Sequence, residues 1–269
     1  MNKITFTVEV ITPELAKEYL LSNTKNRTLS KRTVLLYADI MRRGQWELTH
    51  EGISFDGYGR LLDGQHRLEA IISSGVSVKM VVARGLSSDT FAVINTGKTR
   101  STGDTFSISG IKDSNNMASG VRKYLNMKTG YETSSGKSNT FITNLDVVNE
   151  YESDWAFYDN CLHVAARYYG QLRLLTRSEY FAIYAFLIKE MNHSSEKVEE
   201  FFDQLNSYSD IKAINLFRQR VLLSNASKTK LTPSFKTALL IKCWNAFVLR
   251  KDLKVLKYDE KVENYPVFI

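Results

Sequence analysis

The hydrophobic pattern of this 269-residue chain changes once, and that change limits the folds open to it. Up to about residue 110, short segments with the alternation of a β-strand interleave with segments at helical spacing. From residue 115 onward only helical patterns remain, roughly over 115–128, 143–168, 176–191, 195–206, 209–224 and 232–250. We therefore predict an α+β fold, with an N-terminal domain of strands and helices at 1–112 and an all-α domain at 113–269.

Local signals place the elements of the first domain. Residues 3–11 alternate Ile4, Phe6, Val8 and Val10 with polar residues, which predicts a strand with one buried face. Thr12 and Ser30 are predicted N-caps of two helices, the second of which ends at Gly44. The remaining expected elements are a hairpin at 52–62 that turns through 56–59, a helix that ends at Gly75, a strand at 76–83, a short helix at 87–93 and a linker at 131–140.

Composition narrows the class of protein. The two cysteines, Cys161 and Cys243, lie in apolar helical contexts without metal-ligand spacing, which predicts buried free thiols. No metal site is expected from the four histidines. No apolar run approaches the roughly 20 residues that cross a bilayer. Without a signal-peptide core at the N-terminus, we expect a cytoplasmic protein with no membrane partner.

The formal net charge of +7 is unevenly distributed along the chain. Residues 211–257 contain eleven Lys and Arg and one acid, Asp252, and they follow an acidic helical block. One interpretation is that the two blocks face each other, or that the lysines form a solvated face. The other is a surface that contacts nucleic acid phosphates. The predicted DNA-binding residues are Arg218, Arg220, Lys228, Lys230 and Lys236.

A short segment of the first domain indicates phosphate binding. Leu61 and Leu62 end a strand, and Asp63-Gly64-Gln65-His66-Arg67 turns directly into a helix. Backbone N–H groups and the dipole at a helix N-terminus favour an anion, and a guanidinium beside them can bind phosphate oxygens in pairs. The alternative is structural: Asp63 caps the helix, Arg67 makes a surface ion pair and His66 has no role.

This segment is similar to the signature of the ParB/sulfiredoxin superfamily, in the branch with the sequence Asp-Gly-Gln-His-Arg. The similarity covers roughly residues 5–110 and includes the helix that ends at Gly44 and the following hairpin. It implies a nucleotide-binding domain in which Gly64, His66 and Arg67 contact phosphate and Gln65 lines the site. The implied ligand is a nucleoside triphosphate, ATP or CTP, with Mg²⁺ left open. Such domains belong to phage and mobile-element proteins that handle DNA.

Two departures limit what the resemblance implies. Sulfiredoxins have a cysteine where this chain has Gln65, so repair of sulfinic acid is excluded. The partition proteins that bind CTP have Glu-Arg-Arg after the glycine, whereas this chain has Gln-His-Arg. The base preference therefore does not follow from the family.

A second loop offers cations for the same ligand. Asn95-Thr96-Gly97-Lys98-Thr99-Arg100 resembles the end of a P-loop, but Ala92 stands where the first glycine is required. Related proteins carry an asparagine turn after the same strand, so Asn95, Lys98 and Arg100 are predicted to complete the nucleotide site. An exposed polar turn is the alternative.

No residue qualifies as catalytic. Asp63, Glu69 and Asp104 are the acids near these loops, and none is placed by the sequence as a general base. We predict a nucleotide-binding, DNA-associated protein, with NTP hydrolysis and homo-oligomers left open. The alternatives are a phosphotransferase acting on a small molecule or modified base, and a non-catalytic interaction or inhibitor module.

Overall fold

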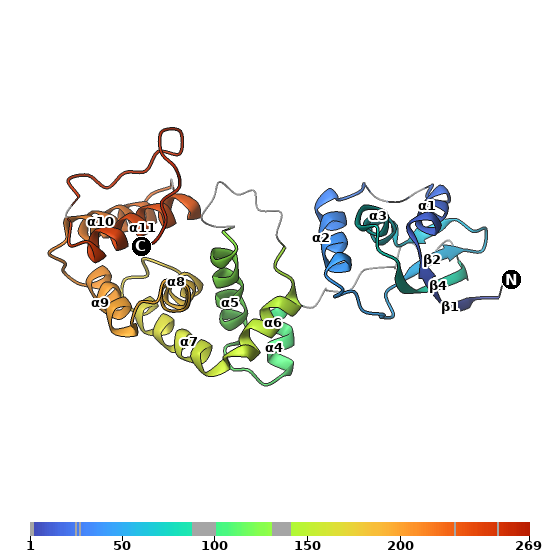
Figure 1. Cartoon of the computed structure of the whole chain (residues 1–269), viewed down its shortest axis with the longest axis horizontal. Helices are drawn as coiled ribbons and strands as arrows, with labels where there is room; N and C mark the ends of the chain where they lie inside the picture. The colour runs from blue at the N-terminus through green and yellow to red at the C-terminus, as the bar shows by residue number, and fades with distance from the viewer. Residues whose placement is uncertain are drawn as a thin grey trace. The chain divides into compact units, whose positions relative to one another are not determined.

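The computed structural model describes residues 3–24, 26, 28–87, 101–130, 141–228, 230–251 and 253–269. The chain forms two compact units, Met1–Thr99 and Arg100–Ile269, which are described separately as unit 1 and unit 2 (Figure 1). Unit 1 combines strands with helices, whereas the described part of unit 2 is helical. The predicted α+β class is thereby confirmed.

Unit 1 is built on one four-stranded sheet with the order β1-β4-β2-β3. Its strands are β1 (Thr5–Ile11), β2 (Ile53–Asp56), β3 (Leu61–Asp63) and β4 (Val78–Leu86). β4 pairs antiparallel with β1 and parallel with β2, and β2 and β3 form the predicted hairpin. Asp56 stabilises the turn, because its Oδ1 accepts from the backbone N–H groups of Tyr58 and Arg60.

Three helices of unit 1 supply its core: α1 (Pro13–Leu21), α2 (Lys31–Arg42) and α3 (Gln65–Ser74). Thr12 and Ser30 accept from the third residue beyond them, so both predicted N-caps are confirmed. α3 packs between α1 and α2. Its buried Leu68 and Ile71 join one hydrophobic cluster with Met80 and Val82 of the sheet.

The prediction for the first strand is wrong about which face is buried. Ile4, Phe6, Val8 and Val10 are each at least half exposed. Pairing with β4 places Phe6 beside Ala83 and Val8 beside Val81, on the face opposite the buried Met80 and Val82. Apolar alternation identified the strand, but it did not identify the side that the helices cover.

Unit 2 contains eight described helices. They are α4 (Thr102–Ile108), α5 (Ser114–Lys128), α6 (Asn144–Ser153), α7 (Trp155–Tyr169), α8 (Arg177–Lys189), α9 (Ser195–Asn206), α10 (Lys212–Ala226) and α11 (Pro233–Val248). The single helical pattern at 143–168 is therefore two helices, which meet at Asp154, where the backbone is not helical (φ = −159°, ψ = 58°). Trp244, Cys161 and Cys243 are fully buried, and burial raises the pKa of both thiols.

The sequence predicts a boundary between residues 112 and 113. In the structure the two units divide earlier, between Thr99 and Arg100. α4 packs against α5 and α6, and the Phe106 ring lies 5.0 Å from that of Tyr151. Arg122 of α5 donates to Thr102 Oγ1, which in turn donates to Asn144. These contacts place α4 in the helical unit. The predicted linker at 131–140 and short helix at 87–93 fall outside the described residues, apart from Ser87.

Candidate functional site

The turn at Asp63–Arg67 directs a strand straight into a helix. Gly64 has φ = 110° and is the N-cap of α3, without a side-chain hydrogen bond to the first turn. A Cβ at this position would lie 3.1 Å from the Ile53 side chain and 3.2 Å from its Cα. The turn therefore requires glycine. Asp63 does not cap the helix, so that part of the structural alternative is wrong.

Arg67 is the centre of the turn's polar contacts. Its Nη1 donates to the Gly52 carbonyl at 3.0 Å and to Asp63 Oδ2 at 3.2 Å, and its Nη2 donates to Glu51 Oε2 at 3.0 Å. The Arg67 side chain is 10 % exposed, whereas that of Glu51 is 62 % exposed. The Glu51 pair is a surface ion pair, which contributes little and can exchange with another anion.

The other residues of the turn are fixed by the segment between α1 and α2. His66 Nε2 accepts from the Ser30 backbone N–H at 2.9 Å, which leaves the ring proton on Nδ1 in a neutral imidazole. Gln65 Oε1 accepts from Asn23 Nδ2 at 3.2 Å. Both side chains are buried. Contacts from Asn23 and Ser30, which lie between α1 and α2, therefore cover the Gln65 and His66 side chains of the predicted site Asp63–Arg67. Asn95, Lys98 and Arg100 lie outside the described residues.

A pocket of about 330 Å³ opens beside Arg67 on the sheet face opposite the described helices of unit 1. Asp63, Glu51 and Arg67 form one wall, and Phe6, Val81 and Ala83 supply apolar surface. Ser54 also lines it, and its buried Oγ has no hydrogen-bond partner among the described residues. This hydroxyl therefore has hydrogen-bonding capacity that the described residues leave unused.

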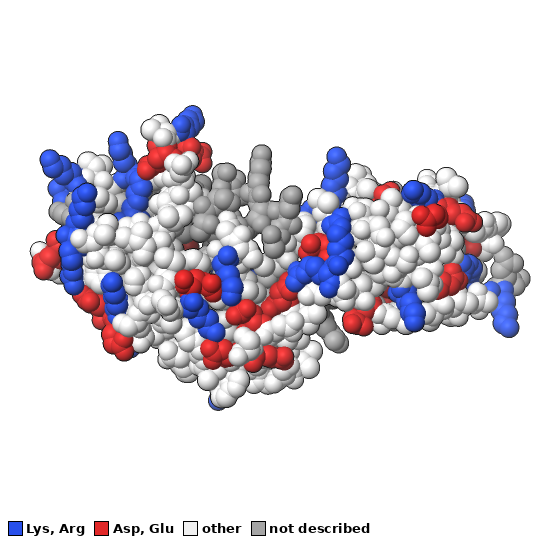
Figure 2. Space-filling view, viewed as in Figure 1, with Lys and Arg blue, Asp and Glu red and all other residues white. Residues whose placement is uncertain are grey.

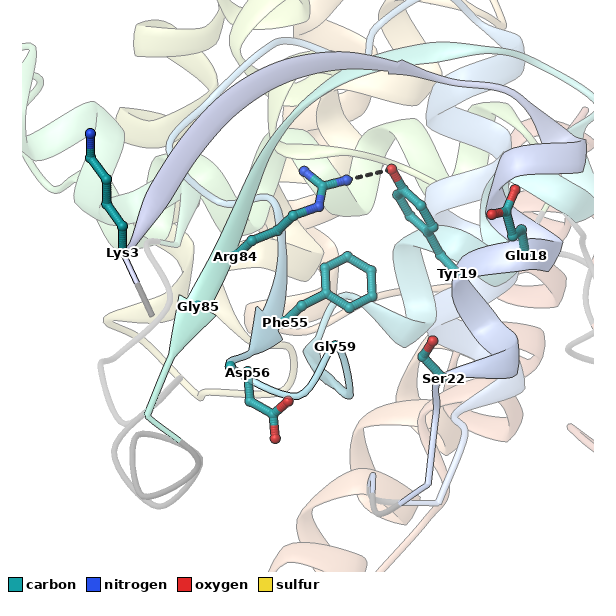
Figure 3. Close-up of a pocket in the computed structure, with 10 residues that line it drawn as sticks. Lys3, Glu18, Tyr19, Ser22, Phe55, Asp56, Gly59, Arg84 and Gly85 are labelled. Carbon is teal, nitrogen blue, oxygen red and sulfur yellow. Dashed lines mark hydrogen bonds between the residues drawn. The ribbon is translucent and has the colours of Figure 1, made fainter. Parts of the chain in front are cut away.

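A second pocket, of about 460 Å³, was not predicted from the sequence (Figure 3). It lies at the end of the sheet, where Arg84 of β4 reaches Tyr19 of α1. Arg84 donates to both carboxylate oxygens of Glu9, at 2.5 and 3.1 Å, and to Tyr19 OH at 2.7 Å. Polar residues on the inner face of β1, Thr7 and Glu9, were the signal that could have indicated it.

The charges of this second pocket are internally balanced. The hydrogen bonds from Arg84 lower the pKa of Glu9 to about 2. Burial, followed by the hydrogen bond to Glu9, raises the pKa of Tyr19 to about 12. Glu9 and Arg84 therefore stay ionised, and Tyr19 neutral, across the ordinary pH range. The trio fixes α1 to the sheet and supplies no group that titrates near neutrality.

The structure separates the five predicted DNA-binding residues into two kinds. Four of them contact their own unit. Arg218 donates to the Gln204 and Leu205 carbonyls at the end of α9, and Lys230 donates to the Ser224 and Asn225 carbonyls of α10.

Arg220 donates to the Leu256 carbonyl and lies 5.0 Å from the centre of the Phe235 ring. Lys236 pairs with Glu179 at 2.8 Å. Lys228 differs, because it is exposed and forms no hydrogen bond or ion pair with the described residues. In Figure 2, the visible Lys and Arg side chains of unit 2 are interspersed with acidic ones.

One of the acids considered as a catalytic residue, Asp104, has a structural role. Asp104 is the third residue of α4 and forms a capping box with Ser101. Its role is therefore to stabilise the start of this helix. Within the described ranges, no group of three or more His, Cys, Asp or Glu side chains could hold a metal ion. None of the helices in those ranges is both long and apolar enough to span a bilayer.

Comparison of the chain with protein-family models, curated proteins and solved structures gives no match.

Proposed function

We propose that unit 1 binds a nucleoside triphosphate, with a phosphate on Arg67 and the rest of the ligand in the pocket beside it. The observation that carries the proposal is the position of the Arg67 guanidinium. Gly52 and Asp63 hold Nη1, and among the described residues Nη2 donates to the exposed carboxylate of Glu51. The resemblance of Asp63–Arg67 to the ParB/sulfiredoxin superfamily supports the choice of a nucleotide.

The chemistry of phosphate binding follows from this ion pair. A carboxylate oxygen of Glu51 occupies the place that a phosphate oxygen would take on Nη2. A triphosphate carries more charge and offers several acceptors to a planar guanidinium. The N-terminal end of α3 adds partial positive charge in the same turn. An entering phosphate therefore displaces Glu51 at small cost, because the Glu51 carboxylate is largely solvated.

The pocket provides surface for the nucleoside. Phe6 is 68 % exposed, and its ring can stack on a base without regard to base identity. Ser54 Oγ supplies a buried hydroxyl for a polar edge of the base or ribose. A volume of about 330 Å³ is at the lower end of small-ligand sites, so it suits the nucleoside while the phosphates remain at the rim.

Binding, rather than hydrolysis or phosphate transfer, is the activity that we propose. Both carboxylates in the pocket wall, Asp63 and Glu51, are ion-paired with Arg67. A general base must be able to reach the proton that it takes, and these pairs do not favour that role. Mg²⁺ would arrive with the triphosphate, as it usually does when phosphates supply most of its ligands.

Calorimetry with ATP, CTP, GTP and ADP, with and without Mg²⁺, tests the proposal. We expect Glu51→Gln to tighten binding by about two- to fivefold, because it removes a competing carboxylate of surface ion-pair strength. Arg67→Lys retains the charge but loses the paired donors, and should weaken binding about tenfold or more.

The matched control is Glu47→Gln, which removes an exposed acid four residues before Glu51 in the chain and outside the pocket lining. Circular dichroism verifies that each variant is folded. Absence of heat with every nucleotide contradicts the proposal. So does an equal response to Glu47→Gln and Glu51→Gln, since a general charge effect would then account for both.

We also propose that unit 2 associates with DNA through exposed lysines of the basic segment, of which Lys228 is the predicted one without an intramolecular partner among the described residues. Lys228→Gln should reduce the slope of log affinity against log salt by about one, as expected for one phosphate contact. Lys230→Gln is the control, because that ammonium caps α10. Electrophoretic shift of duplex DNA over a salt series measures both, and salt-independent binding contradicts the proposal.

A further inference from the structure

Strand β1 lies at one edge of the sheet and is not protected against further pairing. In the order β1-β4-β2-β3, no described strand lies on its other side. Its pairing with β4 runs without a bulge from Thr5 to Ile11. The strand contains no proline, glycine or lysine, which are devices that blunt the edge strands of natural sheets. Its outer backbone groups are therefore available to another strand.

The same strand presents an apolar row on the face that none of the described helices covers. Ile4, Phe6, Val8 and Val10 are each at least half exposed. Four apolar side chains in succession on the solvated side of an edge strand are unusual, because such a surface promotes association. Unpaired backbone and exposed apolar side chains thus occur on one segment.

An antiparallel second copy of β1 can match this row residue by residue. The four residues are symmetric about Thr7, so an antiparallel copy centred there places Ile4 against Val10 and Phe6 against Val8. A one-residue shift would instead oppose apolar and polar faces. A second copy therefore supplies a strand of equal length with its apolar row on the same face.

Charge is compatible with the same register. Glu9 is the only ionisable residue within β1, and its carboxylate is already paired with Arg84. In the register centred on Thr7, Glu9 faces Thr5 of the second copy, and Lys3 faces Ile11. No two like charges are opposed, which removes the usual penalty of pairing identical strands.

We propose that two copies of this chain associate through β1 to form a continuous antiparallel sheet across a two-fold axis at Thr7. Phe6, which also lines the pocket beside Arg67, would gain Val8 of the second copy as its neighbour. The surface row then becomes a longer apolar face shared by both copies. The association does not require that a nucleotide be bound.

Cysteine cross-linking of the full chain tests the register. In Thr7→Cys, the two new thiols face each other across the axis, within the span of a disulfide. We expect a covalent dimer under mild oxidation. In the control Thr5→Cys the thiols are offset by four residues, about 13 Å, and should not cross-link. The native Cys161 and Cys243 are buried and give little background.

Sedimentation of the unmodified chain provides a second measurement that does not depend on folding of the Thr7→Cys variant. The mass should rise with concentration toward that of a dimer. Val8→Lys should weaken dimerisation at least tenfold, whereas Val262→Lys, at an exposed site of unit 2, should not. A monomer at every concentration overturns the proposal, as does equal cross-linking of Thr5→Cys and Thr7→Cys. Association only with a different protein or peptide strand also overturns it.

Discussion

Gly52→Ala should destabilise unit 1 by at least about 3 kcal/mol, since overpacking against rigid atoms costs this much or more. A Cβ at position 52 would lie 1.8 Å from the carbonyl oxygen of Val81 and 2.7 Å from its carbonyl carbon. Both atoms belong to the backbone of β4, so no rotamer change can relieve the clash. The start of β2 must move away from β4.

This movement reaches the candidate site. The Gly52 carbonyl accepts from Arg67 Nη1, and Glu51 precedes it in the chain. Ile53, the next residue, pairs with Val82 in the parallel ladder. Separation of β2 from β4 therefore releases Arg67 from its backbone anchor. We expect the variant to lose nucleotide binding together with stability.

Hydrogen exchange in urea, read on peptides from β2 and β4, measures the loss in unit 1 without interference from unit 2. The control is Gly44→Ala, where the backbone has φ = 67° but no atom lies within 4 Å of the added Cβ. That variant meets only the backbone strain of a left-handed position, about 1 kcal/mol. Equal effects of the two substitutions would show that the close approach to Val81 is unimportant.

Lys236→Ala should destabilise unit 2 by about 3 kcal/mol, as is typical when one partner of a buried ion pair is removed. Lys236 Nζ lies 2.8 Å from Glu179 Oε2, and the Glu179 side chain is only 6 % exposed. The same carboxylate accepts from the Thr176 backbone N–H in the capping box of α8. Removing the lysine leaves that charge buried beside α11.

Urea unfolding of Lys236→Ala and Lys228→Ala measures the difference. The exposed Lys228 should change the free energy of unfolding by no more than about 0.5 kcal/mol. Adding Glu179→Gln to Lys236→Ala should recover part of the loss, because the uncompensated charge is then gone. An Lys236→Ala variant as stable as the parent would mean that water already solvates Glu179.

The substitutions of Lys236 and Lys228 distinguish a lysine that stabilises the fold from one that is free to contact a partner. Lys228 and Lys236 are both cations of the basic segment, and composition cannot distinguish them. One of them neutralises a buried acid 57 residues away in the chain. The basic segment is therefore partly an internal counter-charge to the acidic helices, as the first interpretation of the charge pattern expected. The proposed contact with DNA would fall to its exposed lysines.

The sequence by itself determined the features that depend on neighbouring residues. The helix starts at Thr12 and Ser30, the hairpin after Asp56 and the strand-to-helix turn at Gly64 were all predicted, because caps and turns are formed by side chains a few positions apart. The change from mixed to helical pattern also gave the fold class correctly. The division of the helix at Asp154 was not predicted, because apolar spacing continues on both sides of this residue.

Only the tertiary structure decided which face, partner and surface each residue has. The alternation in β1 is compatible with burial of either side, and packing of α1 and α3 covered the side of Glu9 rather than that of Phe6. Arg67 meets Glu51 and Gly52 because two strands and a helix converge, and no local rule brings those residues together. Contacts between distant segments depend on the whole fold, which is why the turn at Gly64 could be predicted and the ion pairs around Arg67 could not.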